Sequence, residues 1–123
     1  MALACLAAPP AGAAEQIFCR DETSAADVHA CRLDSLEQVE AEIRALYEQV
    51  LTKLHQEDAD RQTNTEAGLR ASQRAWLRFR DLTCAAEAEF FEGRPEWQPA
   101  EDAQCQGMMA VMRRDDLEYL LEE

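Results

Sequence analysis

The sequence predicts an all-α protein in which an antiparallel helical hairpin carries a third packed helix and disulfides staple the three together. The chain has 123 residues, enough for one domain with a modest core. It contains only four Gly and four Pro, while 47% of its residues are hydrophobic and 30% are charged, a composition typical of helices. Apolar residues recur at steps of three or four over three long segments, without the alternation typical of strands.

Residues 1–14 form an apolar segment without a charge, and Ala11-Gly12-Ala13 near its end matches the small residues expected before a signal-peptidase site. No basic residue precedes the apolar run, so we expect residues 1–14 to be a partial signal peptide or a disordered leader. Residues 15–123 then form a single helical domain. Lipid anchoring through Cys5 is an alternative, although Ala2-Leu3-Ala4 fits a lipobox only loosely.

The first helix is expected from Thr23 to about Leu54. Thr23 or Ser24 can cap it, and Asp27 adds a favourable negative charge in the first turn. Beyond Leu54 the pattern gives way to polar residues, and we expect a turn near residues 60–64. The apolar positions that predict this helix are Val28, Leu33, Leu36, Val39, Ile43, Leu46, Tyr47, Val50, Leu51 and Leu54.

The second helix is expected to start from an N-cap at Thr65. On one of its faces Arg70, Arg74 and Arg78 stand four residues apart, and acids of the first helix are the obvious partners for them. The opposite face is the predicted buried stripe, with unbroken steps of three and four: Leu69, Ser72, Trp76, Phe79, Thr83, Ala86 and Phe90.

A loop is expected from Phe91 to Ala100, because Gly93 and two prolines are poorly suited to a helix interior. The third helix then runs from Glu101 or Asp102 to Leu121. Its predicted apolar side consists of Met108, Met109, Met112, Tyr119 and Leu120.

The chain is strongly acidic, with 25 Asp and Glu against 12 Lys and Arg and a formal net charge of −13. This charge repels phosphate backbones and anionic lipids, so nucleic acid and membrane surfaces are poor candidate partners. We expect no membrane-spanning segment, and the sequence does not determine the oligomeric state. The sign of the charge reverses along the chain, since residues 61–80 carry five Arg and one Glu, and residues 81–102 carry seven acids and one Arg. Helix packing explains this reversal better than ligand binding does.

Five cysteines in so short a chain favour an oxidising compartment. Without the leader and its Cys5, an even number remains, as a disulfide framework requires. Bridging Cys84 and Cys105 would clamp the Pro-containing loop, and Cys19 would then pair with Cys31. A bridge between Cys31 and Cys84 is the rival, because an antiparallel hairpin brings these helix ends close.

Metal-binding and catalytic patterns are weak in this sequence. There is no Cys-x-x-Cys pair, and the set of Cys19, His29 and Cys31 is too loose to predict a zinc site. No nucleophile turn or phosphate loop accompanies the few serines and histidines, and paired acids such as Asp115-Asp116 are typical of a solvated helix surface. We expect no metal, no cofactor and no enzymatic activity.

A set of spaced residues resembles the signature of the LprI family, small secreted bacterial domains named after a lysozyme inhibitor. The resemblance covers roughly residues 19–120, and Ile43-Arg44 departs from it, because the family often has Leu-Asn there. The matching residues are Cys19, Cys31, Tyr47, Gln73, Trp76, Phe79, Arg80, Asp81, Cys84, Cys105, Arg113 and Leu117.

The resemblance implies a secreted, periplasmic or lipid-anchored helical domain that inhibits c-type lysozyme. The acidic charge supports this in one respect, because c-type lysozymes are strongly basic and would be steered to the chain. The alternative is a periplasmic structural or binding module with another partner.

We favour a structural role for the motif residues over a role in binding. Trp76 and Phe79 are expected to anchor the core. Arg80 and Asp81 cannot face each other as helix neighbours, so each is expected to pair with another helix or cap its end. Arg113 is expected to pair with an acid of the first or second helix.

The predicted loop supplies the candidate partner interface, formed by Phe91, Arg94 and Trp97. Loops lie on the surface, and aromatic and Arg side chains are enriched in binding hot spots. The alternative is that Trp97 folds back to cover the open end of the helix bundle, which would bury a large apolar surface.

Overall fold

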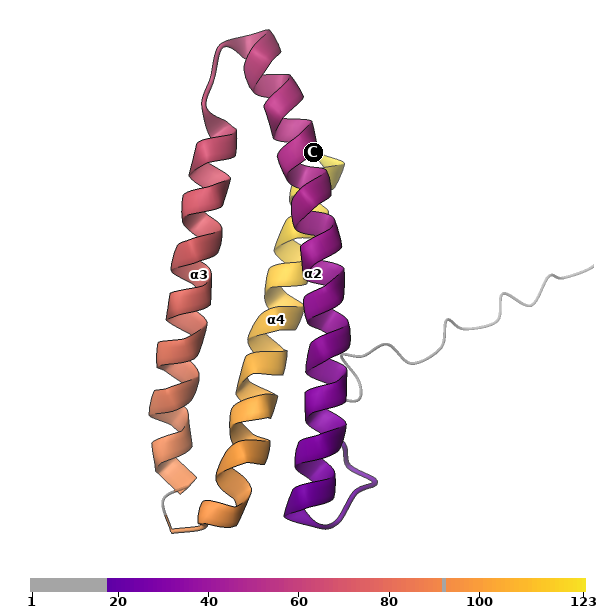
Figure 1. Ribbon diagram of the computed structural model, residues 1–123, viewed down its shortest axis with the longest axis vertical. Helices are drawn as coiled ribbons and strands as arrows, with labels where there is room; N and C mark the ends of the chain where they lie inside the picture. The colour runs from indigo at the N-terminus through magenta and orange to yellow at the C-terminus, as the bar shows by residue number, and fades with distance from the viewer. Residues whose placement is uncertain (1–17, 92) are drawn as a thin grey trace, which may run out of the picture.

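The computed structural model describes residues 18–91 and 93–123 and contains three long helices in up-down-up order (Figure 1). They are α2 (Ala25–Arg61), α3 (Thr65–Ala88) and α4 (Gln98–Glu122). Two short 3-10 helices, η1 (Glu89–Phe91) and η2 (Pro95–Trp97), lie between α3 and α4. No strand occurs in the described residues, so the all-α prediction is confirmed. The predicted leader, residues 1–14 with Cys5, lies outside them.

The ends of α2 follow from local chemistry. Ser24 caps the helix, as expected, because its hydroxyl accepts the backbone N–H of Asp27 at 3.1 Å. The helix continues past the predicted end near Leu54 to Arg61, where Gln62 adopts a left-handed conformation with φ of 56°. The turn therefore falls within the expected region, residues 60–64.

Asp58 organises this turn and replaces the predicted cap of α3. Its carboxylate accepts the hydroxyls of Thr63 and Thr65 at 2.7 and 2.6 Å. It also accepts the backbone N–H groups of Thr65 and Glu66, both at 2.9 Å. Thr65 is thus the first helical residue and not the N-cap, since a carboxylate from the preceding helix satisfies the free amides.

The main core lies between α2 and α4, which run in the same direction and come closest to each other. From α2 it includes Val39, Val50 and Leu51, and Leu117 from α4 is fully buried against them. Most buried residues of both helices recur at steps of three and four, as in parallel packed helices, whereas Cys105 lies between these steps on α4 and bonds to α3.

The predicted apolar side of α4 is wrong for three of its five residues. Met108, Met112 and Tyr119 are exposed, whereas Met109 and Leu120 are half-buried. The buried side consists mainly of small residues, which allow close approach to α2: Ala100, Ala103, Cys105, Gly107, Ala110, Arg113 and Leu117. The helix also begins earlier than expected, at Gln98, because a proline at position 99 is tolerated in the first turn.

The predicted buried stripe of α3 is also wrong in part. Leu69 is buried and Trp76 half-buried, but Phe79 and Phe90 are 61% and 85% exposed. The reason is the fixed direction of Cys84, which is fully buried and bonded to α4. Phe79 lies five residues earlier, about 140° around a helix of 3.6 residues per turn, and therefore lies outside the core, where it borders surface residues of α4. Ser72 and Ala86 are exposed as well, and Thr83 is half-buried.

Both expected disulfides are confirmed: Cys19–Cys31 and Cys84–Cys105. The first ties the N-terminal arm to α2 within a second, small core that contains Val28 and Ala100. The second joins the end of α3 to the start of α4, so that the intervening segment is held at its base.

Candidate functional site

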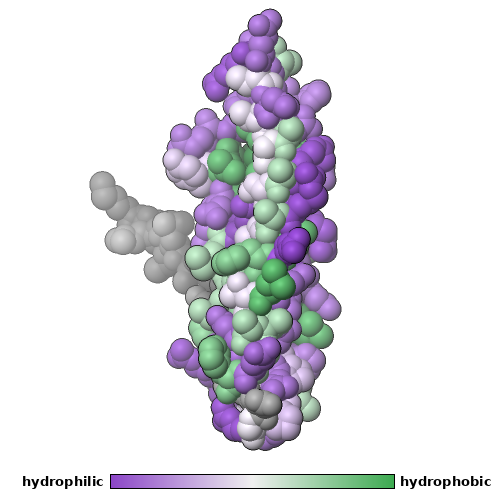
Figure 2. Space-filling view, turned by 90° about the vertical axis from the view of Figure 1, so that its left-hand side faces the viewer, coloured by the Kyte–Doolittle hydropathy of each residue, from purple (hydrophilic) through white to green (hydrophobic). Residues whose placement is uncertain are grey.

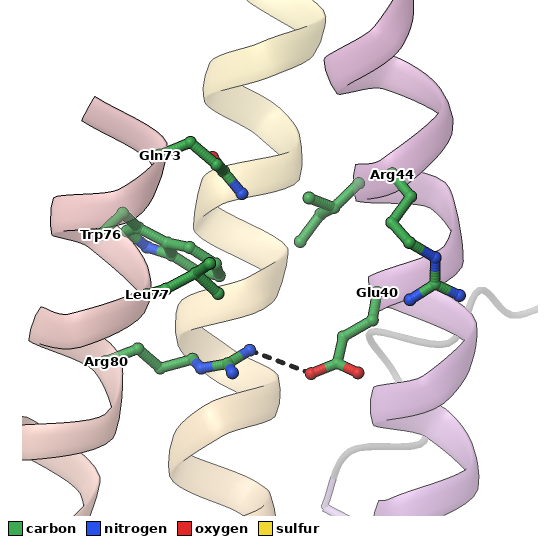
Figure 3. Close-up of a pocket in the computed structure, with 7 residues that line it drawn as sticks. Glu40, Arg44, Gln73, Trp76, Leu77 and Arg80 are labelled. Carbon is green, nitrogen blue, oxygen red and sulfur yellow. Dashed lines mark hydrogen bonds and ion pairs between the residues drawn. The ribbon is translucent and has the colours of Figure 1, made fainter. Parts of the chain in front are cut away.

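A cleft of about 310 Å³ lies between α2 and α3, and three residues of the family motif line it. Figure 3 shows Gln73, Trp76, Leu77 and Arg80 on α3 directed toward α2, from which Glu40 points toward Arg80, while the Arg44 side chain runs along α2. Ile43 completes the lining. We call this space the Trp76 cleft.

Trp76 forms the aromatic wall of the cleft. It is half-buried and packs against the main core, as expected for a core anchor. The guanidinium carbons of Arg80 and Arg113 lie 5.2 and 5.9 Å from the ring centroid, within the range of a cation–π interaction. The indole therefore joins α3 to α4 as well as to the core.

Arg80 pairs across to another helix, as expected, whereas Asp81 does not. Nη1 of Arg80 donates to Oε1 of Glu40 on α2 at 2.9 Å. Nε of the same guanidinium donates to Oδ1 of Asp81 at 3.3 Å. The expectation that these neighbours cannot meet is wrong, because the long Arg80 side chain turns its guanidinium back toward the helix surface. Asp81 itself is 65% exposed.

Arg113 is buried, and its hydrogen bonds go to neutral groups. Its Nε donates to Oε1 of Gln73 at 2.9 Å, and its Nη2 donates to Oγ of Ser72 at 3.2 Å. The expected partner, an acid of the first or second helix, is thus replaced by an amide and a hydroxyl. Burial lowers the pKa of Arg113, but a guanidinium stays charged in proteins. The contact with Trp76 compensates part of the cost of burying that charge.

A second groove, of about 360 Å³, lies on the other side of Trp76 between α3 and α4. Phe79, Met112 and Asp116 are among its lining residues. Trp76 therefore separates two surface hollows. Both are partly apolar and suit a partner side chain better than a small polar substrate.

Sequence reasoning missed four residues of the Trp76 cleft: Glu40, Ile43, Arg44 and Leu77. A signal was present for two of them, since Ile43-Arg44 is the position where the chain departs from the family pattern. Glu40 gave no signal, because one acid among many on an acidic helix does not stand out.

The proposed interface residues lie in the connection between α3 and α4. Arg94 is exposed, and its backbone oxygen accepts the N–H of Trp97 at 3.0 Å. Trp97 is half-buried and packs against the small core of Cys19, Val28 and Ala100. The side chain of Phe91 lies outside what the structure describes. Trp97 thus adopts the alternative position and covers the end of the bundle.

The part of the chain that the structure describes contains no group of three or more His, Cys, Asp or Glu able to hold a metal ion. Within the same residues, no helix combines the length and apolar character needed to cross a bilayer.

These features define a small, disulfide-linked three-helix domain with an aromatic cleft between two helices. The chain belongs to the LprI family: the family model described as lysozyme inhibitor LprI matches residues 19–117. Comparisons with curated proteins and with solved structures give no match.

Proposed function

We propose that this chain is a secreted or periplasmic inhibitor that blocks c-type lysozyme by binding it, and that it is not an enzyme. The observation that carries the proposal is the family match over residues 19–117. The two disulfides support a location in an oxidising compartment, where such bonds persist.

Charge supports a basic partner. The formal net charge is −13, and opposite net charges accelerate encounter and favour correct orientation. The gain lies mainly in the association rate and shrinks with salt, because the Debye length falls from about 30 Å at 0.01 M to about 8 Å at 0.15 M.

Arg94 is the residue that we assign to the contact with lysozyme. It is exposed at the end of the bundle where the chain passes from α3 to α4, together with Gly93, Pro95 and Glu96 (Figure 1). The catalytic cleft of lysozyme carries two carboxyl groups. The exposed guanidinium of Arg94 can pair with them, although the protein as a whole is acidic.

Trp97 is assigned a supporting role, because it packs on the small core beneath the segment. The Cys84–Cys105 bridge holds the same segment from its other side. A segment held in this way loses less conformational entropy on binding than a free loop does.

Lysis of bacterial cell walls by c-type lysozyme tests the proposal. The wild-type chain is expected to inhibit lysis, and Arg94→Ala to weaken inhibition by about tenfold or more, which corresponds to about 1.4 kcal/mol. Arg61→Ala, at an exposed arginine at the end of α2, is the matched control and should inhibit normally. Trp97→Ala should weaken inhibition and lower the melting temperature together.

The outcomes distinguish a failure of the proposed function from a failure of the proposed contact through Arg94. Uninhibited lysis with the wild-type chain refutes the function and favours a binding module with another partner. Full inhibition by Arg94→Ala keeps the function but refutes the proposed contact.

A further inference from the structure

The side of α3 that faces away from the core is apolar. Phe79 is 61% exposed, Leu82 is 62% exposed and Phe90 is 85% exposed. The exposed residues Ala75, Phe79, Leu82, Ala86 and Phe90 follow one another at steps of four, three, four and four. They therefore share one side of α3 and its continuation into η1. We call these five residues the outer face of α3. Figure 2 views this side and shows hydrophobic residues gathered along it between hydrophilic ones.

Single exposed apolar residues are ordinary, but an aligned group that includes two phenylalanines marks an interaction surface. Aromatic side chains are also enriched in the cores of protein interfaces. The outer face is not required for the fold, because α3 is already joined to its neighbours by Cys84, Arg80 and Trp76.

The charges along one edge of this face change sign. Arg74 and Arg78 occupy the first half of the edge, and Asp81 and Glu89 occupy the second half. All four residues are exposed. We call them the charged edge.

We propose that the outer face of α3 binds a second copy of this chain, with the two α3 helices antiparallel. When Phe79 of one copy lies level with Leu82 of the second, Arg74 lies level with Glu89 and Arg78 with Asp81, to within about 3 Å along the axis. A two-fold axis perpendicular to the helices brings the same edge of both copies together. This one arrangement therefore covers the apolar face of both copies. It also places the arginines of each charged edge beside the acidic residues of the other.

The charged edge selects this occupant over two others. A parallel pair of α3 helices would place the charged edge of one copy beside the opposite edge of the second, so the pairs of Arg with acidic residues would be lost. A strongly basic enzyme would meet Arg74 and Arg78 with the same sign of charge. A second copy in the antiparallel orientation meets neither penalty, and isologous two-fold dimers are the commonest symmetric assembly.

Sedimentation equilibrium of the chain alone, at about 0.15 M salt where distant charges are screened, tests the proposal. A concentration-dependent dimer is expected, and Phe79→Asp should raise its dissociation constant by tenfold or more. Tyr119→Asp is the matched control, because Tyr119 is also 61% exposed but lies on α4, and it should leave the constant unchanged. Far-UV circular dichroism checks that both variants remain helical.

Charge exchange tests the orientation. Arg74→Glu alone should weaken the dimer, because it would place two acids level with each other. The double variant Arg74→Glu with Glu89→Arg should restore it. A chain that stays monomeric up to millimolar concentration overturns the proposal, as does a dimer that Phe79→Asp leaves unchanged. If the chain is monomeric and its Phe79→Asp variant fails to inhibit lysozyme, the outer face binds the enzyme and not a second copy.

Discussion

Arg80 on α3 and Glu40 on α2 form an ion pair across the Trp76 cleft, with 2.9 Å between Nη1 and Oε1. The side chain of Arg80 is 11% exposed and that of Glu40 is 31% exposed. The same guanidinium lies over the ring of Trp76, so one arginine connects α2, the aromatic wall and α3. This contact matters because α3 packs less closely against α2 than α4 does.

A double-mutant cycle with Arg80→Ala and Glu40→Ala should therefore give a coupling energy of about 1 kcal/mol, at the upper end for exposed pairs. Urea unfolding measures it. Arg114 and Glu42 form the comparison pair between α4 and α2, where the Glu42 side chain is 48% exposed, and they should couple less strongly. Equal coupling in the two pairs would show that the lower exposure of Glu40 adds nothing.

Trp76→Ala should destabilise the fold by about 2–4 kcal/mol, because a half-buried indole loses less than the full cost of deleting a buried aromatic. Phe79→Ala, three residues away and 61% exposed, is the control and should change stability by less than about 0.5 kcal/mol. Both are measured in urea at a concentration too low for association. A Trp76→Ala variant as stable as the control would mean that the indole is not a core anchor.

Asp58→Asn should lower the melting temperature at neutral pH. Hydrogen bonds from Thr65, Glu66 and Thr63 hold the pKa of Asp58 well below its ordinary value of 3.8. A carboxylate whose pKa is lower in the folded state adds stability above its ordinary pKa, and that stability is lost as the pH falls through the lowered value.

The melting temperatures of wild type and Asp58→Asn should accordingly converge as the pH falls from about 5 to about 2. Thermal melts across this range provide the measurement. A difference that stays constant with pH would show that the lost contacts are steric and do not depend on the charge of Asp58.

Replacing Cys84 and Cys105 by serine should cost about 3 kcal/mol, from the entropy that the bridge removes from the unfolded chain. The Cys19 and Cys31 pair closes a shorter loop and should cost slightly less on the same basis. Loss of the Cys84–Cys105 bridge should also weaken lysozyme inhibition, since it frees the segment that carries Arg94. Unchanged inhibition in a folded Cys84→Ser/Cys105→Ser variant would contradict that role.

Local patterns predicted the parts of the fold that are decided locally. Ser24 caps α2 through a contact three residues away, and Cys84 and Cys105 bracket one short connection. For the same reason, the helical segments and the turn near Gln62 were predictable, although α2 runs seven residues past its predicted end at Leu54.

The rotation of α3 and the buried side of α4 could not be predicted in this way. A hydrophobic stripe placed Phe79 and Phe90 inside, but the direction of Cys84 decides which side of α3 faces the core. On α4 the large methionines formed the obvious apolar side, yet Ala103 and Ala110 are buried. The partners of Arg80 and Arg113 come from distant positions, and their identities depend on that rotation.

The initial rate at which c-type lysozyme hydrolyses a soluble, uncharged oligosaccharide is the most direct test of inhibition by this chain, because no anionic cell wall competes for the basic enzyme. With increasing amounts of this chain at about 0.15 M salt, where non-specific attraction between opposite charges is screened, we expect the rate to fall toward zero. The inhibition should saturate at a fixed molar ratio of chain to enzyme. A rate that stays unchanged in large molar excess of the correctly disulfide-bonded chain would show that the chain does not inhibit lysozyme.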